Sequence, residues 1–140
     1  MTPPLVMLDT DISSYIIKRN RPWMRERLED LDPAGVFVSV VVQAELLYGL
    51  QKLPADHFLH DEVHGFLDGM RLRAWDENAA DIHARLRYQL ISSGHPIGEM
   101  DMMIAAHAIA LGAVLVTDNT RHFERIAPPL LLENWALPPD

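Results

Sequence analysis

The sequence predicts an α/β fold, a three-layer sandwich with a short, mostly parallel central sheet between layers of helices. Short apolar runs of strand length alternate along the chain with longer segments of helical pattern, which favours parallel strands joined by helices. Turn-forming residues separate these segments, as at Asp32-Pro33-Ala34-Gly35 and Gly94–Gly98. Two of the apolar runs end at an aspartate, and ligands bind at the carboxyl ends of strands in sheets of this class.

In the first half of the chain, the apolar run Leu5–Leu8 is expected to form a buried strand. Helices are expected from Ile12 to Asn20 and from Pro22 to Leu31, because proline is accepted in a first helical turn. Val36–Ser39 is the second expected strand. Its last residue, a serine, can cap a helix that runs on to Gln51.

The second half of the chain repeats this alternation of helices and strands. A helix closed by Gly112 is expected, because glycine readily takes the backbone conformation that ends a helix. The expected helices are Asp56–Gly69, a long helix from Asp76 or Asn78 to Ser92, and Glu99–Gly112. The expected strands are Leu72–Trp75, Ala113–Thr117 and, at one edge of the sheet, Leu130–Glu133.

The length and composition indicate a single globular domain over residues 1–140, with 49% apolar and 23% charged residues. The absence of cysteine excludes disulfides and thiolate metal sites, and it is typical of the reducing cytoplasm, where we expect the protein to act. The amino-terminal sequence has neither a basic leader nor a long apolar run. No apolar stretch reaches the roughly 20 residues that span a bilayer, so no membrane association is expected.

The net charge of −8 argues against a protein that holds nucleic acid tightly through many phosphate contacts. Most acidic residues are therefore interpreted as part of a solvated surface. The basic residues are arginines, apart from Lys18 and Lys52, and arginine is suited to bidentate contacts with phosphate. A transient RNA substrate is compatible with this composition, although composition does not require one.

Two aspartates directly follow apolar strands. Asp9 comes after the first expected strand and Asp118 after the strand Ala113–Thr117, so both are expected at the carboxyl edge of the sheet. Each position has a simpler interpretation as well. Asp9 can cap the helix that begins near Ile12, and Asp118 can serve as a turn residue before Asn119.

Two further acids interrupt helices that are otherwise apolar. Glu45 has no basic residue three or four positions away, and an unpaired carboxylate is costly to bury. Its alternative position is a narrow solvent-facing stripe with Gln43 or Gln51. Asp101 lies in the first turn of a helix that is apolar almost all round. An aspartate there is also favoured by the helix dipole alone.

Four carboxylates brought together repel one another, and some would take up protons near neutral pH unless a cation were present. A hard divalent cation with oxygen ligands, such as Mg²⁺, removes this conflict. Such an ion can lower the pKa of an attacking water and stabilise a leaving oxygen. The predicted chemistry is therefore hydrolysis of a phosphate ester at Asp9, Glu45, Asp101 and Asp118.

Four segments, in this order, carry a resemblance to a known family: LDTDISSYII, SVVVQAELLYGL, GHPIGEMDMMIAAHAIALGAVLVTDNTRHFERI and LLLENW. Over essentially the whole chain the sequence resembles a VapC-type toxin ribonuclease of the PIN-domain family. The resemblance implies a PIN-like nuclease domain that hydrolyses RNA with Mg²⁺ or Mn²⁺. It also implies the toxin of a type II toxin–antitoxin pair, which is usually a homodimer and is neutralised by a VapB-type antitoxin.

The resemblance assigns roles to particular residues. The first acid of the family falls on Asp9, its helix glutamate on Glu45 and its third acid on Asp101. The fourth position is assigned to Asp118, with Asn119 as the alternative, and Thr117 or Asn119 can bind water or support the ligands there. A further departure is an aspartate at position 11, where the family commonly has asparagine. An extra carboxylate there can bind a metal ion through water.

A partner that inserts an arginine or lysine into the acidic pocket would displace both metal and substrate. Apolar residues near the acids in sequence can line a groove for such a peptide, although ordinary core packing is the expectation for at least half of them. They are Ile16, Ile17, Leu46, Leu47, Tyr48 and Leu50.

Two other functions are compatible with parts of the sequence. A PIN-like module without catalysis would only bind a partner or RNA, but all four acids are present. Asp9-Thr10-Asp11 also resembles the start of haloacid-dehalogenase-type phosphatases, with Asp9 as nucleophile, although Lys18 and Lys52 are poorly placed for that family. His57, His60 and His64 have helical spacing, but the acids among them indicate a solvated face rather than a zinc site. His107 is expected to be a hydrogen-bonded core residue.

Overall fold

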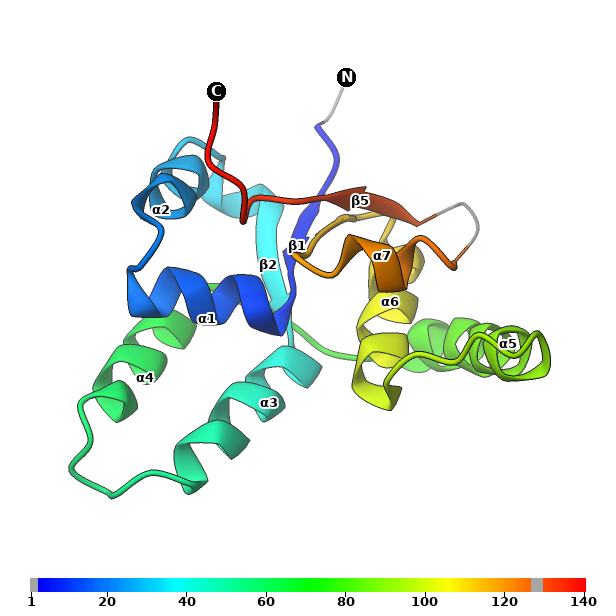
Figure 1. The fold of residues 1–140 in the computed structure, drawn as a ribbon, viewed down its shortest axis with the longest axis horizontal. Coiled ribbons are helices and arrows are strands. Elements are labelled where there is room, and N and C mark those ends of the chain that lie inside the picture. Colours follow the sequence, from blue (N-terminus) through cyan, green and yellow to red (C-terminus); the bar gives the residue numbers. More distant parts are fainter. Residues whose placement is uncertain (1–2, 127–129) are drawn as a thin grey trace.

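The computed structural model of the protein describes residues 3–126 and 130–140. Its centre is a five-stranded sheet in the order β3-β2-β1-β4-β5, and every strand pairing is parallel (Figure 1). The strands are β1 (Val6–Leu8), β2 (Val36–Ser39), β3 (Arg71–Arg73), β4 (Val114–Val116) and β5 (Leu131–Glu133).

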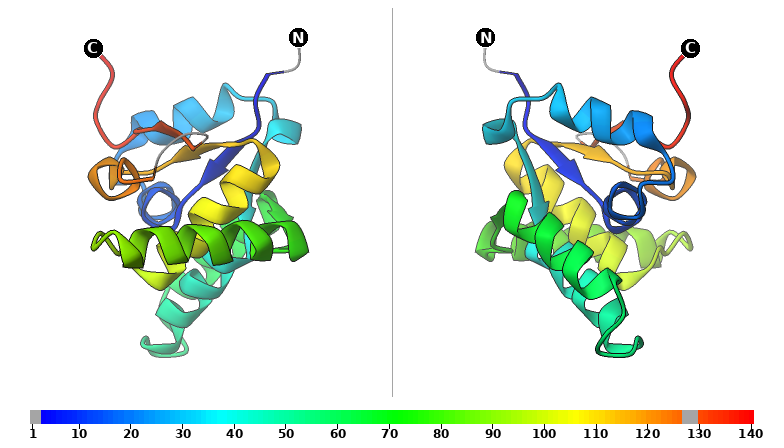
Figure 2. Two further views of the ribbon diagram at one scale, coloured as in Figure 1. Left: turned by 90° about the vertical axis from the view of Figure 1, so that its right-hand side faces the viewer. Right: turned by 90° about the vertical axis from the view of Figure 1, so that its left-hand side faces the viewer.

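Helices connect the strands and cover the sheet. They are α1 (Thr10–Lys18), α2 (Pro22–Glu29), α3 (Val40–Gln51), α4 (Leu59–Gly69), α5 (Glu77–Ser92), α6 (Glu99–Leu111) and α7 (Thr120–Phe123), with a short 3₁₀ turn at Pro33–Gly35. Figure 2 shows α2 on one side of the sheet and the packed pair α5 and α6 on the other. The predicted α/β sandwich is thereby confirmed, with a sheet that is parallel in all its described pairings.

The strand order reverses at β1, which lies in the middle of the sheet. From β1 the chain moves outward through β2 to β3, and it later returns to the other side of β1 with β4 and β5. Leu8 pairs with Val116, and the backbone N–H of Asp9 donates to the Val116 carbonyl at 3.0 Å. The carboxyl ends of β1 and β4 are therefore level, and this switch point is where α/β sheets bind ligands.

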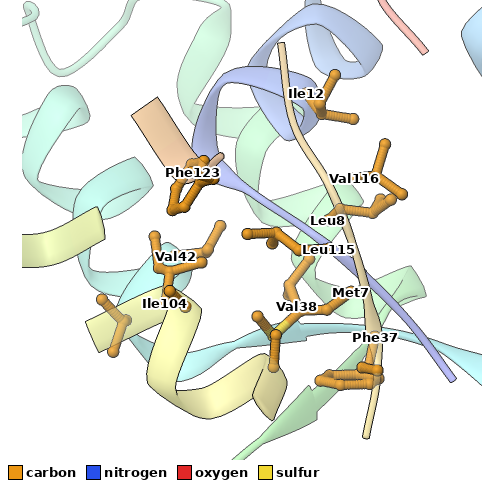
Figure 3. Packing of buried hydrophobic residues seen from close by; sticks show 14 of the residues in the cluster. Met7, Leu8, Ile12, Phe37, Val38, Val42, Ile104, Leu115, Val116 and Phe123 are labelled. Atoms are coloured by element: carbon orange, nitrogen blue, oxygen red, sulfur yellow. The ribbon is translucent and has the colours of Figure 1, made fainter. Parts of the chain in front are cut away.

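The core lies on both faces of the central strands. Met7 and Leu115 are register partners and share the face that α6 covers, whereas Val38 alternates to the opposite face. Ile104 of α6 belongs to the same buried core (Figure 3). All four side chains are at most 1% exposed. Burial of each such side chain contributes roughly 1.5–3 kcal/mol, so the strands that carry the site are among the most firmly held parts of the fold. The apolar character of the strand runs predicted this two-sided burial.

Several elements differ from the sequence expectations, and α1 runs from Thr10 to Lys18 rather than from Ile12 to Asn20. Helix α4 begins at Leu59 rather than Asp56, because the ring of His57 accepts the Leu59 amide and holds a turn before the helix. Strand β3 lies at Arg71–Arg73, slightly earlier than expected, in register with Phe37–Ser39 of β2. The short helix α7 was not predicted, since four residues are too few to show helical periodicity.

Candidate functional site

Asp9 stands between β1 and α1 and caps the helix. Its Oδ1 accepts the backbone N–H of Ile12 at 2.9 Å, and the side chain is only 4% exposed. Burial raises the pKa of Asp9 to about 7, against the lowering effect of hydrogen bonds from Thr117 and Ile12. The charges of Asp11 and Asp101 raise it further. Asp9 therefore has the capping role that the sequence suggested. The capping hydrogen bond also fixes the position of a carboxylate whose charged form is disfavoured by burial.

Glu45 projects from α3 toward the start of α1. The hydroxyl of Thr10 donates to Glu45 Oε1 at 2.6 Å, between residues 35 positions apart. The glutamate is half-buried, so it does not lie on a fully solvated stripe. A single hydrogen bond thus ties α3 to the residue that follows Asp9 and orients the carboxylate.

Asp101 lies in the first turn of α6 and is half-buried. The cap residue of this helix is Gly98, and no side chain makes the capping hydrogen bond. Burial raises the pKa of Asp101, the charges of Glu45 and Asp11 add to this, and His122 opposes it. Oδ2 of Asp101 is 4.0 Å from Nδ1 of His122 on α7.

Asp118 follows β4 but differs from the other acids in being exposed. Its Oδ2 accepts the hydroxyl of Tyr15 on α1 at 3.1 Å. The neighbouring Asn119 has its Nδ2 2.8 Å from Nδ1 of His122, and its backbone N–H donates to Thr117 Oγ1 at 3.0 Å. Asn119 thus faces His122 and, through it, the Asp101 side of the site, whereas Asp118 faces α1.

The four predicted acids fall into two groups. The first group, called here the inner acids, is buried or half-buried and consists of Asp9, Glu45 and Asp101. The charge of Asp101 raises the pKa of Asp9, and the charge of Glu45 raises the pKa of Asp101. Asp118 and Tyr15, with Arg21 beside the tyrosine, form a second group, called here the rim. The amino-terminal ends of α1 and α3 lie close to the end of β1, as Figure 1 shows, and the Thr10 hydroxyl there contacts Glu45.

The donor set of the inner acids is suited to a hard divalent cation, because it consists of oxygen atoms only. The raised pKa values of Asp9 and Asp101 point the same way, since a cation would favour their charged forms. Across residues 3–126 and 130–140, no three acidic or histidine side chains lie close enough to hold one ion together. Mg²⁺ does not require three, because it keeps several waters and binds through one or two carboxylates.

The histidine cluster on α4 makes other contacts. Nε2 of His60 is 3.0 Å from the Pro54 carbonyl, and the ring of His57 stacks on Phe58. The prediction for His107 is confirmed, since this residue is 1% exposed and its Nδ1 lies 2.8 Å from the hydroxyl of Ser39.

Sequence reasoning missed Thr10, Tyr15 and His122 as parts of the site. Thr10 and Tyr15 lie within the segment LDTDISSYII, and their positions one and six residues after Asp9 on a helix are the signal that was available. His122 depends on α7, a helix too short to be predicted.

The suggested apolar groove is mostly core. Ile16, Ile17, Leu46 and Leu50 are buried, whereas Leu47 is half-buried and Tyr48 is 64% exposed. Among the residues described, none of the helices combines the length and the apolar character that crossing a bilayer requires.

Comparison with known proteins agrees with this fold. The family model of the PIN domain matches residues 6–128. The tRNA(fMet)-specific endonuclease VapC of Salmonella typhimurium is 36% identical over 129 residues, which is 92% of this chain and 96% of that protein. Ribonuclease VapC2 of Rickettsia felis is 36% identical over 132 residues, or 94% and 98% of the two chains. The chain therefore belongs to the PIN-domain family, among its VapC-type ribonucleases.

Solved structures show the same fold. The crystal structure of DNA-bound VapBC from Salmonella typhimurium matches with a TM-score of 0.87 at 35% identity, covering 95% of this chain and 99% of that one. VapBC2 from Rickettsia felis, bound to a DNA fragment from its promoter, matches with a TM-score of 0.85 at 34% identity, covering 94% and 98%. Family membership and the burial of Asp9 both speak against the phosphatase alternative, which needs an accessible nucleophile.

Proposed function

We propose that this chain is a divalent-metal-dependent endoribonuclease, the toxin of a type II toxin–antitoxin pair, and that residues 1–140 form one PIN-like nuclease domain. The observation that carries this proposal is the buried Asp9 at the sheet edge, with a pKa of about 7 and the charge of Asp101 acting on it. Such a carboxylate has its natural partner in a divalent cation. The ribonuclease names of the VapC relatives supply the substrate class.

We propose that the inner acids and Asp118 bind Mg²⁺ or Mn²⁺, with one or two of the inner acids in direct contact and the others acting through water, as the exposed Asp118 does. When bound, the ion lowers the pKa of an attacking water and stabilises charge on the phosphate oxygens. The chain's own contribution is orientation. The Ile12 amide fixes Asp9, and the Thr10 hydroxyl fixes Glu45, so that the carboxylates are set before substrate arrives.

For the RNA substrate we propose transfer RNA, on the strength of the Salmonella typhimurium relative, whose name states specificity for tRNA(fMet). The acidic surface of the present chain, with a net charge of −8, favours a transient complex over tight retention. Rapid release suits an enzyme that cleaves many molecules.

As partners we propose a VapB-type antitoxin, because similar solved structures are VapBC complexes, and a second copy of this chain, which the family resemblance implies. In the described residues no lysine or arginine forms an ion pair with the inner acids, so a positively charged antitoxin side chain could bind there, close to His122. The exposed Tyr48 on α3 offers an apolar contact next to that path.

The proposal is tested by incubating the purified chain with unfractionated transfer RNA in Mg²⁺, in Mn²⁺ and in chelator, followed by mapping of the new RNA ends. We expect discrete cleavage with either metal and none in chelator. Asp101→Asn should abolish cleavage, and Asp81→Asn, which changes an exposed acid on α5, should not. Absence of cleavage in every metal would instead indicate a PIN-like module that only binds.

A further inference from the structure

Arg21 is placed beside the acidic site by the sharp turn between α1 and α2. Arg19 ends α1 in the left-handed conformation, with a φ of 58°, and its backbone N–H donates to the Tyr15 carbonyl at 3.1 Å. This reverses the chain, so that the next helix begins at Pro22 and Arg21 folds back over the last turns of α1. The Cζ atom of Arg21 lies 3.9 Å from the centre of the Tyr15 ring.

The arginines on either side of Arg21 are engaged within the protein. Arg19 pairs with Glu62 at 3.6 Å, Arg25 donates to the Ile16 carbonyl at 3.1 Å, and Arg27 pairs with Glu133. The Arg21 guanidinium makes no ion pair with a carboxylate in residues 3–126 and 130–140. Its Nη1 is also buried without a hydrogen-bond partner. Because Nη1 is shielded from solvent, an external anion must be bound by the other nitrogens of this half-buried guanidinium, which form no ion pair in the described residues.

The anion that fits is a phosphate of the substrate backbone. Tyr15 presents its ring to Arg21 and donates its hydroxyl to Asp118, so one tyrosine side chain separates the guanidinium from the acidic site. When the scissile phosphate of an RNA strand lies at the inner acids, the neighbouring phosphates of that strand must lie over the residues around the site, which include the rim. A planar guanidinium stacked on an aromatic ring is pre-oriented for bidentate contact with such a phosphate.

We propose that Arg21 binds a backbone phosphate of the RNA that flanks the cleaved bond, and that Tyr15 sets the spacing of this contact from the acids. The inference rests on the proposed ribonuclease function. Arg21 is then a substrate-binding residue rather than a packing residue, and it supplies positive charge where an acidic protein would otherwise repel its substrate.

The test measures the kcat and KM of transfer RNA cleavage at several salt concentrations for the wild type, Arg21→Gln, Arg21→Lys and Arg85→Gln. For Arg21→Gln we expect KM to rise about tenfold and kcat to change less than about threefold. The slope of log KM against log salt should fall by about 0.7, the effect of one lost phosphate contact on a single strand. Arg21→Lys should keep the slope because it keeps the charge.

Arg85→Gln is the matched control, since Arg85 forms an exposed pair with Asp81 on α5, and it should behave as the wild type. A second measurement uses an oligoribonucleotide across the mapped cleavage site with one flanking phosphate replaced by a neutral methylphosphonate. One such position should weaken the wild type and leave Arg21→Gln unaffected. An active wild type with an unchanged slope in Arg21→Gln would overturn the phosphate contact alone, whereas an inactive wild type would overturn the ribonuclease function with it.

Discussion

The inner acids and the rim lie at the same edge of the sheet, yet their surroundings differ. Asp9 is buried, and burial has raised its pKa to about 7, whereas Asp118 is exposed and is held by a neutral hydroxyl from Tyr15. Carboxylates in the first environment interact strongly with a cation, because little water screens them. On the function proposed above, we expect the inner acids to carry most of the metal's chemistry, and the rim to contribute a water-linked carboxylate, Asp118, and a substrate contact, Arg21.

The contrast is tested most directly by removing one carboxylate from each group. Asp9→Asn should reduce RNA cleavage by about a thousandfold or more, and Asp118→Asn by only about tenfold, because loss of a buried ligand removes far more stabilisation than loss of an exposed, water-linked one. Single-turnover cleavage at saturating metal measures both. Equal losses in the two variants would remove the distinction between the groups.

A second test uses the pH dependence of stability in the absence of metal. The folded-state pKa of Asp9 lies near 7, above the ordinary value of 3.8, so the folded protein binds the extra proton between these values. Stability should therefore be greatest below about pH 4 with respect to this group, should fall by on the order of 4 kcal/mol between about pH 4 and pH 7, and should level off at higher pH.

Asp9→Asn should flatten this part of the profile, as measured by urea unfolding at a series of pH values. Mg²⁺ should restore stability to the wild type at pH 8 and have little effect at pH 5, since protons compete with the metal for the carboxylate. An identical profile for wild type and variant would show that Asp9 is not the group responsible.

A substitution at Thr10 can remove the hydrogen bond that orients Glu45 while keeping all of the inner acids. Thr10→Val deletes the hydroxyl that donates to Glu45 at 2.6 Å and keeps the shape of the side chain. We expect cleavage to fall by about 10- to 100-fold, the usual effect of losing a residue that orients a metal ligand. Thr10→Ser keeps the hydroxyl and should retain most activity, so a similar loss in both variants would point to packing instead.

The smallest expected effect concerns the rim. Tyr15→Phe removes the hydrogen bond to Asp118 but keeps the ring against Arg21. We expect kcat to fall by a few-fold, in line with the loss of about 1 kcal/mol for one exposed hydrogen bond, while the salt dependence of KM stays that of the wild type. A lowered salt slope in this variant would show that the hydroxyl, rather than the ring, holds Arg21 in place.

Local sequence patterns were sufficient to predict the sheet and the positions of its acids. The apolar runs before Asp9 and Asp118 predicted two strand ends at one edge, and the pairing of Leu8 with Val116 places those ends level. Ser39 was also recognised as a helix cap from its position between a strand and a helical pattern, and it accepts the Val41 amide at 3.0 Å.

The contacts that distinguish the acids from one another were not predictable in this way. The partner of Glu45 is Thr10, and the partner of Asp118 is Tyr15, across separations of 35 and 103 residues. Periodicity reports which face of an element is buried, but it does not report which two elements will touch. The choice between a capping and a ligand role for Asp9 needed the same information, because both depend on what faces the carboxylate.

At the acidic edge of the sheet, strand β2 is followed directly by helix α3 with no loop residue between them. Ser39 is both the last residue of β2 and the cap of α3, and its hydroxyl lies 2.8 Å from His107 on α6. One residue inserted there would turn α3 by roughly 100° and carry Glu45 away from Thr10. The β2–α3 junction therefore offers no hinge. Any change of shape that accommodates a bulky polynucleotide must occur in other segments of the protein or in the polynucleotide itself.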